Sequence, residues 1–298
     1  MADSDRAATP DWMHRRTFPF RHMVPFLVCH LVVLGAFFTG VTWQAVALCA
    51  VLYFVRMFGV TAGYHRYFAH RSFKTSRVFQ FVLAFIATSS AQKGALWWAA
   101  HHRRHHKYSD QEGDVHSPVR EGFLWSHMGW LFVDGSEETD LARIRDFAKY
   151  PELRFLNRFQ LLPPTLLALA CLAIAGLPGL FIGFFLSTVL LWHGTFLINS
   201  LAHVVGSRRF ETKDESRNNL WLALITLGEG WHNNHHRHQA SCRQGFYWWE
   251  IDVTYYVLFL LSKVRIVWDL RAVPEKVLEE GRQADRERRR ERRTAPAH

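Results

Sequence analysis

The sequence lacks most of the features that mark secreted, disulfide-rich or nucleotide-binding proteins. Its 298 residues include only 4 cysteines, which lie apart from one another, so neither a disulfide framework nor a Cys-x-x-Cys site can be read from them. It contains no glycine-rich dinucleotide loop and no fused haem-binding module. The N-terminal residues include acids and no small-residue cleavage site before the first apolar block, so we expect no removed signal peptide.

Long apolar blocks are present instead, and they define the expected architecture. Hydrophobic residues make up 49% of the chain and gather in runs long enough to cross a bilayer, for which about 20 residues are needed. We therefore expect an all-α integral membrane protein. Its four transmembrane helices should lie at about residues 23–41, 45–63, 160–177 and 180–202.

The charges predict which side of the membrane each segment occupies. Two short turns, residues 42–44 and 176–179, contain no lysine or arginine, although the chain has a formal net charge of +10. Because basic residues favour the cytoplasmic side, both termini and the long polar segments should be cytoplasmic, in what we expect to be a bacterial inner membrane. We attribute the basic excess to anionic lipid and expect no nucleic-acid partner. The expected cytoplasmic parts are an N-terminal segment (1–22), a helical cap (64–159 and 203–281) and a basic tail (282–298).

Three further features of the apolar regions need interpretation. Residues 78–91 carry polar interruptions, and a span there would place the histidine clusters described below on opposite sides, so we expect a helix at the interface. Residues 255–261 are too short to span and should pack against the protein or lie on the membrane surface. Arg56 lies inside the second span, and we expect its side chain to extend toward the lipid head groups.

The 18 histidines include clusters with regular spacing. The pattern His-x-x-His-His occurs at residues 102–106 and again at 232–236, and this spacing places three imidazoles on one face of a helix turn. His65 and His70 form an earlier pair. On an ideal α-helix they would point about 140° apart, so a helix end or a break should separate them.

A polar stripe on the fourth span adds to these clusters. Thr195, Asn199 and His203 recur every four residues, and such a stripe is unfavourable in a membrane unless it faces protein or a site. Nine histidines are too many for one ion, so we expect two metals. Carboxylate-poor, imidazole-rich sites favour redox iron over magnesium, calcium or a closed structural zinc site. The expected ligands are His65, His70, His102, His105, His106, His203, His232, His235 and His236, with Asn199 as a water-bridged tenth.

These motifs, in this order, resemble those of the membrane fatty acyl desaturases, most closely the Δ9 acyl-CoA (stearoyl-CoA) type. The similarity runs from about His65 to Trp249. Beside the histidine boxes it includes Thr61-Ala62-Gly63, Ser126-His127-Met128-Gly129-Trp130 and Gly228-Glu229-Gly230.

The resemblance implies a function for specific residues. The nine histidines would bind two irons, which zinc could replace in a purified sample, and Asn199 would hold one iron through a water molecule. Gln92, Trp98 and Thr195 would line a bent acyl tunnel, and Tyr53 and Met57 match positions near its closed end that set chain length.

The chain also departs from the pattern of the animal members. His101, Lys93 and Ala100 replace an acid, an asparagine and an arginine that help hold the carrier end of the substrate, so the carrier could be coenzyme A, a carrier protein or a lipid. His116 and His127 lie outside the ligand pattern, and we expect them to be structural or surface residues.

The expected activity is therefore O2-dependent introduction of a cis double bond, at Δ9, into a saturated acyl chain. The reaction needs two external electrons, which a separate donor of the ferredoxin or cytochrome b5 type, with its reductase, would supply. One alternative is a membrane diiron hydroxylase of fatty acids or alkanes, which has similar histidine boxes. Another is a histidine-rich metal transporter, although such a protein should hold its ligands near the bilayer midplane.

Overall fold

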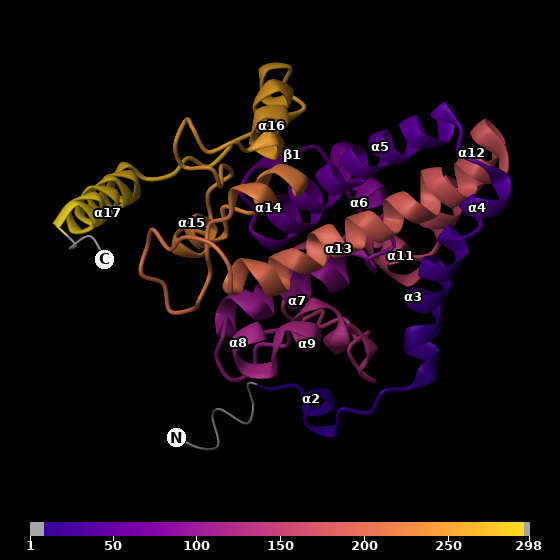
Figure 1. The fold of residues 1–298 in the computed structure, drawn as a ribbon, viewed down its shortest axis with the longest axis horizontal. Helices are drawn as coiled ribbons and strands as arrows, with labels where there is room; N and C mark the ends of the chain where they lie inside the picture. Colours follow the sequence, from indigo (N-terminus) through magenta and orange to yellow (C-terminus); the bar gives the residue numbers. More distant parts are fainter. Residues whose placement is uncertain (1–8, 295–298) are drawn as a thin grey trace.

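The computed structural model describes residues 9–294, and these residues are mostly helical (Figure 1). The only strands within this range are β1 (Lys74–Thr75) and β2 (Val267–Trp268), which pair in antiparallel fashion with Lys74 opposite Trp268. The cores of the expected spans and the histidine clusters all lie inside helices or at helix ends. The predicted helical class is therefore confirmed, apart from this short β pair.

Three helices among the described residues are long and apolar enough to cross a membrane: Phe20–Thr39, Trp43–Ala69 and Leu162–His203. The first consists of α3 (Phe20–Val33) and α4 (Ala36–Thr39), and the second of α5 (Trp43–Phe58) and the π-helical η1 (Gly59–Ala69). The third consists of α12 (Leu162–Pro178), η3 (Gly179–Leu186), α13 (Ser187–Ser200) and η4 (Leu201–His203).

The third apolar helix is sharply broken near its middle. Its 42 residues would extend about 63 Å if straight, roughly twice the hydrocarbon thickness of a bilayer. Ala175 and Gly176 leave helical geometry, and Gly176 has a φ of 62°, a conformation that favours glycine. Beyond the break, Gly179 approaches Cys171 so closely that a Cβ at position 179 would collide with the Cys171 carbonyl oxygen. The chain therefore folds back on itself, and α12 packs against η3.

Shorter helices surround one end of these long ones. In Figure 1, α7, α8 and α9 lie together below α13, and α14 and α15 lie toward the C-terminal side. The bounds of these and the remaining helices are α2 (Asp11–Arg15), α6 (Arg77–Thr88), α7 (Ala95–Tyr108), α8 (Pro118–Glu121), α9 (Phe123–His127), η2 (Gly129–Phe132), α10 (Arg145–Ala148), α11 (Pro151–Arg158), α14 (Leu220–Ile225), α15 (His232–Arg237), α16 (Val253–Lys263) and α17 (Glu275–Thr294).

The tail expected at residues 282–298 continues a longer helix as far as Thr294. The helix α17 begins at Glu275, and Arg209 binds Asp285 on it at 3.1 Å. Arg237 forms a second ion pair with Glu280. Residues 1–8 of the expected N-terminal segment and 295–298 of the tail lie outside the described residues.

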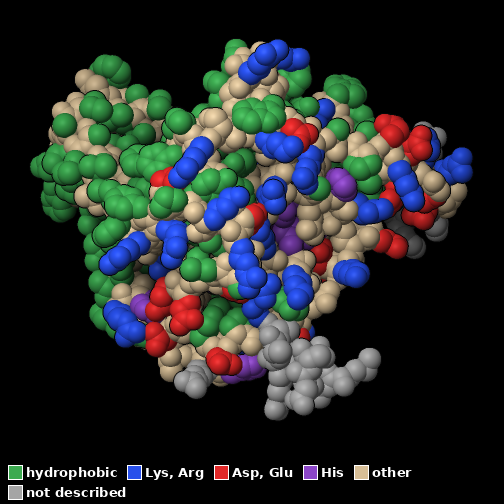
Figure 2. All heavy atoms as spheres, turned by 180° about the vertical axis from the view of Figure 1, so that it is seen from behind, with side chains coloured by type: hydrophobic (Ala, Val, Ile, Leu, Met, Phe, Trp, Pro, Cys, Tyr) green, Lys and Arg blue, Asp and Glu red, His purple; other side chains and the backbone are tan. Residues whose placement is uncertain are grey.

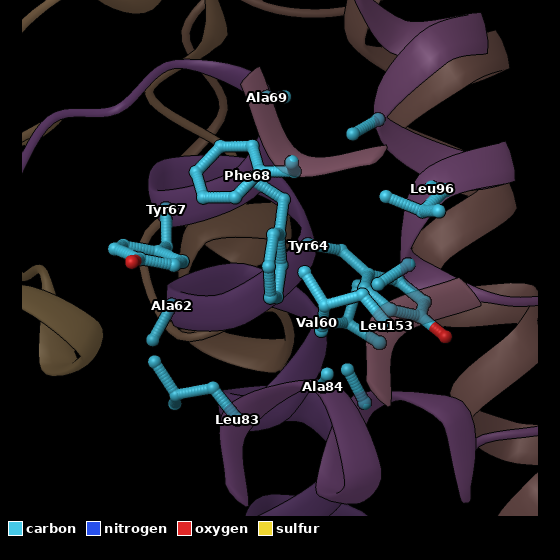
Figure 3. Close-up of a cluster of buried hydrophobic side chains, with 14 of the residues drawn as sticks. Val60, Ala62, Tyr64, Tyr67, Phe68, Ala69, Leu83, Ala84, Leu96 and Leu153 are labelled. Atoms are coloured by element: carbon cyan, nitrogen blue, oxygen red, sulfur yellow. The ribbon is translucent and has the colours of Figure 1, made fainter. Parts of the chain in front are cut away.

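The apolar helix α6 packs one face against the protein and leaves Val78 and Val82 exposed at 76% and 38%, and it does not add a span. It has 12 residues, about 18 Å, which is too short to cross a bilayer. A Cβ at Gly59 would lie 2.7 Å from Ile86, so the glycine lets η1 approach α6 closely. Figure 3 shows the resulting cluster, in which Leu83 and Ala84 of α6 lie beside Ala62 and Tyr64 of η1.

Arg56 contradicts our expectation that its side chain reaches the head groups. Its side chain is 1% exposed and lies between helices. Its guanidinium donates hydrogen bonds to Thr188 Oγ1 at 2.7 Å, Ser187 Oγ at 2.5 Å and the Ser89 carbonyl oxygen at 3.3 Å. Because these acceptors satisfy its donors, Arg56 holds α5 to the start of α13 and to the loop after α6.

The outer surface divides into an apolar and a charged region (Figure 2). Large apolar side chains are exposed on the long helices, including Phe37 at 84%, Phe38 at 89% and Trp43 at 76%. Lysine, arginine and acidic side chains gather elsewhere on the face that Figure 2 shows. Such a wide exposed apolar surface indicates contact with lipid.

Candidate metal centre

Four separate parts of the chain bring histidines to one place. His65 and His70 lie on and just after η1, the three candidate ligands of the box at 102–106 lie on α7, His203 ends η4, and three histidines lie on α15. Within each of two groups, the candidate ligand atoms all lie within 4.8 Å of one another. The first group is His65, His70, His102, His106 and His235, and the second is His105, His203, His232 and His236.

The π-helix explains how His65 and His70 can share a site. The sequence predicted a helix end or a break between them, because five residues on an α-helix turn the side chains apart. The structure instead winds this segment with i to i+5 hydrogen bonds, and the His70 amide donates to the His65 carbonyl oxygen at 3.1 Å. Residues five apart are thus one turn apart, and the two rings meet at 4.7 Å between centroids.

Buried carboxylates fix which ring nitrogen of several histidines faces the centre. His203 Nδ1 lies 2.8 Å from Asp110, and His236 Nδ1 lies 2.7 Å from Asp214. His105 Nδ1 lies 3.1 Å from both oxygens of Asp114. A carboxylate can only accept a hydrogen bond, so Nδ1 of each of these rings carries the proton and donates it. The lone pair of each neutral ring is therefore on Nε2.

These Nε2 atoms face other Nε2 atoms at short range. His203 Nε2 lies 3.1 Å from His232 Nε2, and His65 Nε2 lies 3.1 Å from His235 Nε2. His236 Nε2 is buried and has no hydrogen-bond partner among the described residues. Converging lone pairs repel one another unless a cation lies between them, so both groups fit metal ions that prefer imidazole ligands.

Burial keeps these imidazoles in the metal-binding form. Burial first, and then the charges of neighbouring histidines, hold the pKa of His70, His102 and His235 well below its ordinary value. For His105, burial also lowers the pKa, but the Asp114 carboxylate outweighs it and raises the pKa. Most of the candidate ligands are therefore neutral at pH 7 and retain a lone pair.

The four carboxylates behind the histidines were not identified from the sequence. They are Asp110, Asp114, Asp214 and Glu229. A usable signal exists for two of them, because Asp110 and Asp114 follow the box at 102–106 closely and histidine ligands usually donate to a carboxylate. Asp214 lies in an irregular loop, and no spacing rule connects it to His236.

Glu229 is part of a buried ionic network that joins η1 to the loop before α15. It pairs with His65 Nδ1 and, at 3.0 Å, with Arg66, which is 1% exposed. Arg66 also binds Asp252 at 2.9 Å. Gly228 has a φ of 124°, and a Cβ there would collide with the Asp252 carboxylate, which explains why glycine precedes Glu229.

A small cavity of about 40 Å³ lies against both histidine groups. Its lining includes His65, His102, His105 and His232. It also includes three of the five residues that the resemblance assigned to an acyl tunnel, Met57, Trp98 and Thr195, and Asn199, the expected water-bridged ligand. This volume is far below the ~300 Å³ or more of a usual ligand pocket, so an acyl chain would have to displace side chains.

The other two predicted tunnel residues lie behind the cavity wall. Gln92 donates a hydrogen bond to Thr195 Oγ1 at 3.1 Å. The Tyr53 hydroxyl donates to the Ile225 carbonyl oxygen at 2.7 Å. Each therefore supports a neighbouring element rather than lining the cavity itself.

His116 and His127 are both buried, so the surface alternative is wrong for them. His116 stacks on His105 with ring centroids 4.4 Å apart. His127 bonds Ser200 Oγ at 3.0 Å and His193 at 2.9 Å. Both fit the structural role that we considered for them.

The fold and this site define a helical protein with long apolar helices and a buried histidine centre suited to two metals. A family model described as fatty acid desaturase matches residues 41–285. The chain belongs to the fatty acid desaturase family, and this confirms the predicted relationship.

Curated relatives share about a third of their residues with this chain. An sn-1 stearoyl-lipid 9-desaturase of Synechocystis is 35% identical over 275 residues, which cover 92% of this chain and 84% of the relative. A chloroplastic palmitoyl-monogalactosyldiacylglycerol delta-7 desaturase of Arabidopsis thaliana is 35% identical over 89% of this chain and 72% of its own. An acyl-CoA 5-desaturase of Anemone leveillei is 38% identical over 83% and 78%. The chain is therefore an oxidoreductase of lipids.

Proposed function

We propose that the chain is an O2-dependent fatty acyl desaturase that introduces a cis double bond, at Δ9, into a saturated acyl chain. It would use two irons and two external electrons per turnover. The observation that carries this proposal is the pair of histidine groups whose lone pairs converge beside an apolar-walled cavity. The Synechocystis relative and several others are named as 9-desaturases, which favours Δ9.

The proposed ligands are the nine histidines, with Asn199 acting through a water molecule. Asn199 lines the same cavity as His105 and His232, which supports its inclusion. Iron at these sites would supply O2 activation and hydrogen removal from unactivated methylene groups, chemistry that no side chain provides. Zinc could occupy the same imidazoles in a purified sample, because it favours them as well.

The side chains around the proposed centre position the reactants and exclude water. The carboxylates Asp110, Asp214 and Glu229 hold three imidazoles in the tautomer that directs Nε2 inward. The side chains of Met57 and Trp98 make the adjoining wall apolar. The carbon atoms held against the centre would be selected by the cavity shape, a positional effect.

Chain length would be set on the side of the cavity formed by α5 and α13. Met57 lines the cavity, and its Cε lies 3.1 Å from where a Cβ of Gly194 would be. The Tyr53 hydroxyl lies at the same distance from that point. The two side chains therefore converge on Gly194 and would limit how far an acyl chain extends.

We propose a topology of four spans with the histidine centre and both termini on the cytoplasmic side of a bacterial inner membrane. The break at Ala175 and Gly176 would divide Leu162–His203 into two spans. Electrons would come from a separate protein of the ferredoxin or cytochrome b5 type, which would dock on the basic face. The substrate carrier could be coenzyme A or a lipid, since relatives of both names are similar to this chain.

Expression in a host that lacks its own desaturase tests the proposal. Double-bond mapping in the host lipids should find a cis Δ9 product, and His235→Ala should abolish it while the protein stays in the membrane. Retained product in that variant would contradict the diiron assignment. A hydroxylated product would favour the hydroxylase alternative, and metal flux into vesicles without O2 consumption would favour the transporter.

A further inference from the structure

A continuous row of aromatic rings leads away from the second histidine group. It starts at His105, whose ring centroid lies 4.4 Å from that of His116. The ring of His116 lies 5.2 Å from that of Trp130, and Trp130 stacks on Trp97 at 5.8 Å with only 6° between the ring planes. Aromatic pairs in contact have centroids about 4.5–7 Å apart, so each ring of the row contacts the next.

The row continues to the surface of the protein. Trp97 and Trp130 are 4% and 5% exposed and form one apolar cluster with Met13. The half-buried Trp12 and Trp125 pack against this cluster. Figure 1 shows α2, which carries Trp12, at the lower edge of the molecule below α9. Contacting aromatic side chains therefore connect a proposed metal ligand with the solvent.

Packing alone does not explain the tryptophan at position 130. Its indole N–H is buried and has no hydrogen-bond partner among the described residues. The indoles beside it are paired, since Trp97 donates to the Ser136 carbonyl oxygen at 2.9 Å and Trp125 to that of Val115 at 3.1 Å. Phenylalanine would give an aromatic ring without an unpaired donor, which is unfavourable when buried. The indole differs from phenylalanine in a second property, because it loses an electron far more easily.

The surroundings of Trp130 suit a transient positive charge. An oxidised indole is a radical cation, and it loses its N–H proton where a base accepts it. Trp130 has no such acceptor among the described residues, so the charge stays free to move to the next ring. The buried Asp114 carboxylate lies 3.9 Å from His116 Nδ1, and its negative charge favours a cation on the neighbouring indole.

We propose that this aromatic row, formed by His116, Trp130 and Trp97 and ending at Trp12 and Trp125, carries oxidising equivalents from the metal centre to the surface when O2 has reacted without oxidising a substrate. The row would thereby protect the ligands from oxidation. The proposal rests on the desaturase function proposed above, which supplies O2 as the oxidant.

The electrons balance along the row. One electron passes from the Trp130 indole, by way of the rings of His116 and His105, to the oxidised centre, which it reduces. Trp130 then takes an electron from Trp97, and Trp97 takes one from Trp12. Two thiols in the surrounding solution return two such electrons, form a disulfide and release two protons. Without thiols, an indole that has lost two electrons adds water, releases two protons and remains as hydroxytryptophan.

The experiment maps hydroxytryptophan in the full-length, iron-loaded protein by peptide mass spectrometry. The protein is held in detergent without acyl lipid or thiol, reduced with dithionite and exposed to pulses of O2, while catalase and superoxide dismutase remove diffusible oxidants. Trp248, which is 82% exposed, reports attack from the solution. Trp12 and Trp125 should be oxidised at least tenfold more than Trp248. Zinc-loaded protein should show no such excess, because zinc does not change its oxidation state.

Substitutions in the row show the order of transfer. Trp130→Phe should lower oxidation at Trp12 and Trp97 at least tenfold, with the initial iron content and the melting temperature as in the wild type. Over repeated O2 pulses, this variant should lose iron at least threefold faster than the wild type. Trp97→Phe should keep Trp130 oxidised while oxidation at Trp12 falls. Trp221→Phe makes the same change at a 76% exposed position on α14 and should leave the pattern unchanged.

Three results would overturn the proposal: oxidation in the order of solvent exposure, the same pattern in the zinc-loaded protein, or a pattern that neither row variant alters. If Trp130→Phe does not fold, the oxidation of Trp12 in Trp97→Phe decides in its place. Double-bond mapping in host lipids reports separately on the desaturase function. A protein that forms the double bond but is oxidised in the order of exposure refutes the aromatic row alone. Reduced, iron-loaded protein that consumes no O2 refutes both proposals.

Discussion

Removing the Asp214 carboxylate should weaken metal binding at only one of the two histidine groups. Asp214 accepts from His236 Nδ1 at 2.7 Å, and His236 belongs to the group with His105, His203 and His232. Loss of such a partner usually weakens metal affinity about 10- to 100-fold, or about 1.4–2.7 kcal/mol. We expect the upper part of this range for Asp214→Ala, because both side chains are buried and His236 Nδ1 would be left without an acceptor.

The assay is metal content per protein during a titration with a chelator. Asp214→Ala should lose one of its two metals at a chelator concentration at least tenfold lower than the wild type, while the other metal stays. Asp214→Asn, which keeps one acceptor oxygen, should lose this metal at a chelator concentration between those for Asp214→Ala and the wild type. Asp269→Asn, at an exposed site, should match the wild type. Loss of both metals together, or no loss, would refute the view that the carboxylate acts on one site through His236.

Three further outcomes follow from the described contacts. Metal-free protein should become less stable as the pH falls below about 6.5, the pKa of an unfolded histidine. The reason is that burial and then neighbouring charges lower the folded-state pKa of His70, His102 and His235, so the unfolded chain binds more protons in this range. Each such histidine should lower the free energy of unfolding by up to about 1.4 kcal/mol per pH unit in this range. Denaturant unfolding of the chelated protein measures this, and a free energy of unfolding that stays constant between pH 7.5 and 5.5 would contradict it. Arg56→Met should lower the free energy of unfolding in detergent by about 1–3 kcal/mol, because it leaves buried hydroxyl and carbonyl groups unpaired. The melting temperature should fall accordingly, and an unchanged melting temperature would mean that water replaces the guanidinium. Met57→Ala should shift the products toward longer acyl chains in fatty-acid profiles, and an unchanged profile would remove Met57 from the length-setting role.

The histidine groups could be predicted because the spacing of the histidines along the sequence already indicates a metal site. The spacing 102, 105, 106 and its repeat at 232, 235, 236 imply a shared helix face before any fold is known. The pairing of apolar runs then places both on the same side of a membrane. His203 was found through a different signal, the four-residue stripe that includes Asn199.

The partners of these residues could not be predicted, because they depend on tertiary contacts. Asp214 meets His236 from an irregular loop, and Glu229 meets Arg66 across 163 positions of sequence. Arg56 was wrongly assigned to the head groups for the same reason. The hydroxyls that hold it come from a helix 131 and 132 positions later, and a rule that considers one span at a time cannot include them.

The Arg66 network has a consequence for how the protein is made. Arg66 leaves the ribosome long before Glu229 and Asp252, which neutralise it in the folded chain. During synthesis the helix formed by α5 and η1 therefore carries the unpaired Arg66 cation near its end until the last third of the polypeptide emerges. Metal binding must also follow the synthesis of α15, because this helix supplies ligands to both groups. A nascent chain arrested before residue 228 should accordingly stay metal-poor and be degraded faster than the finished protein.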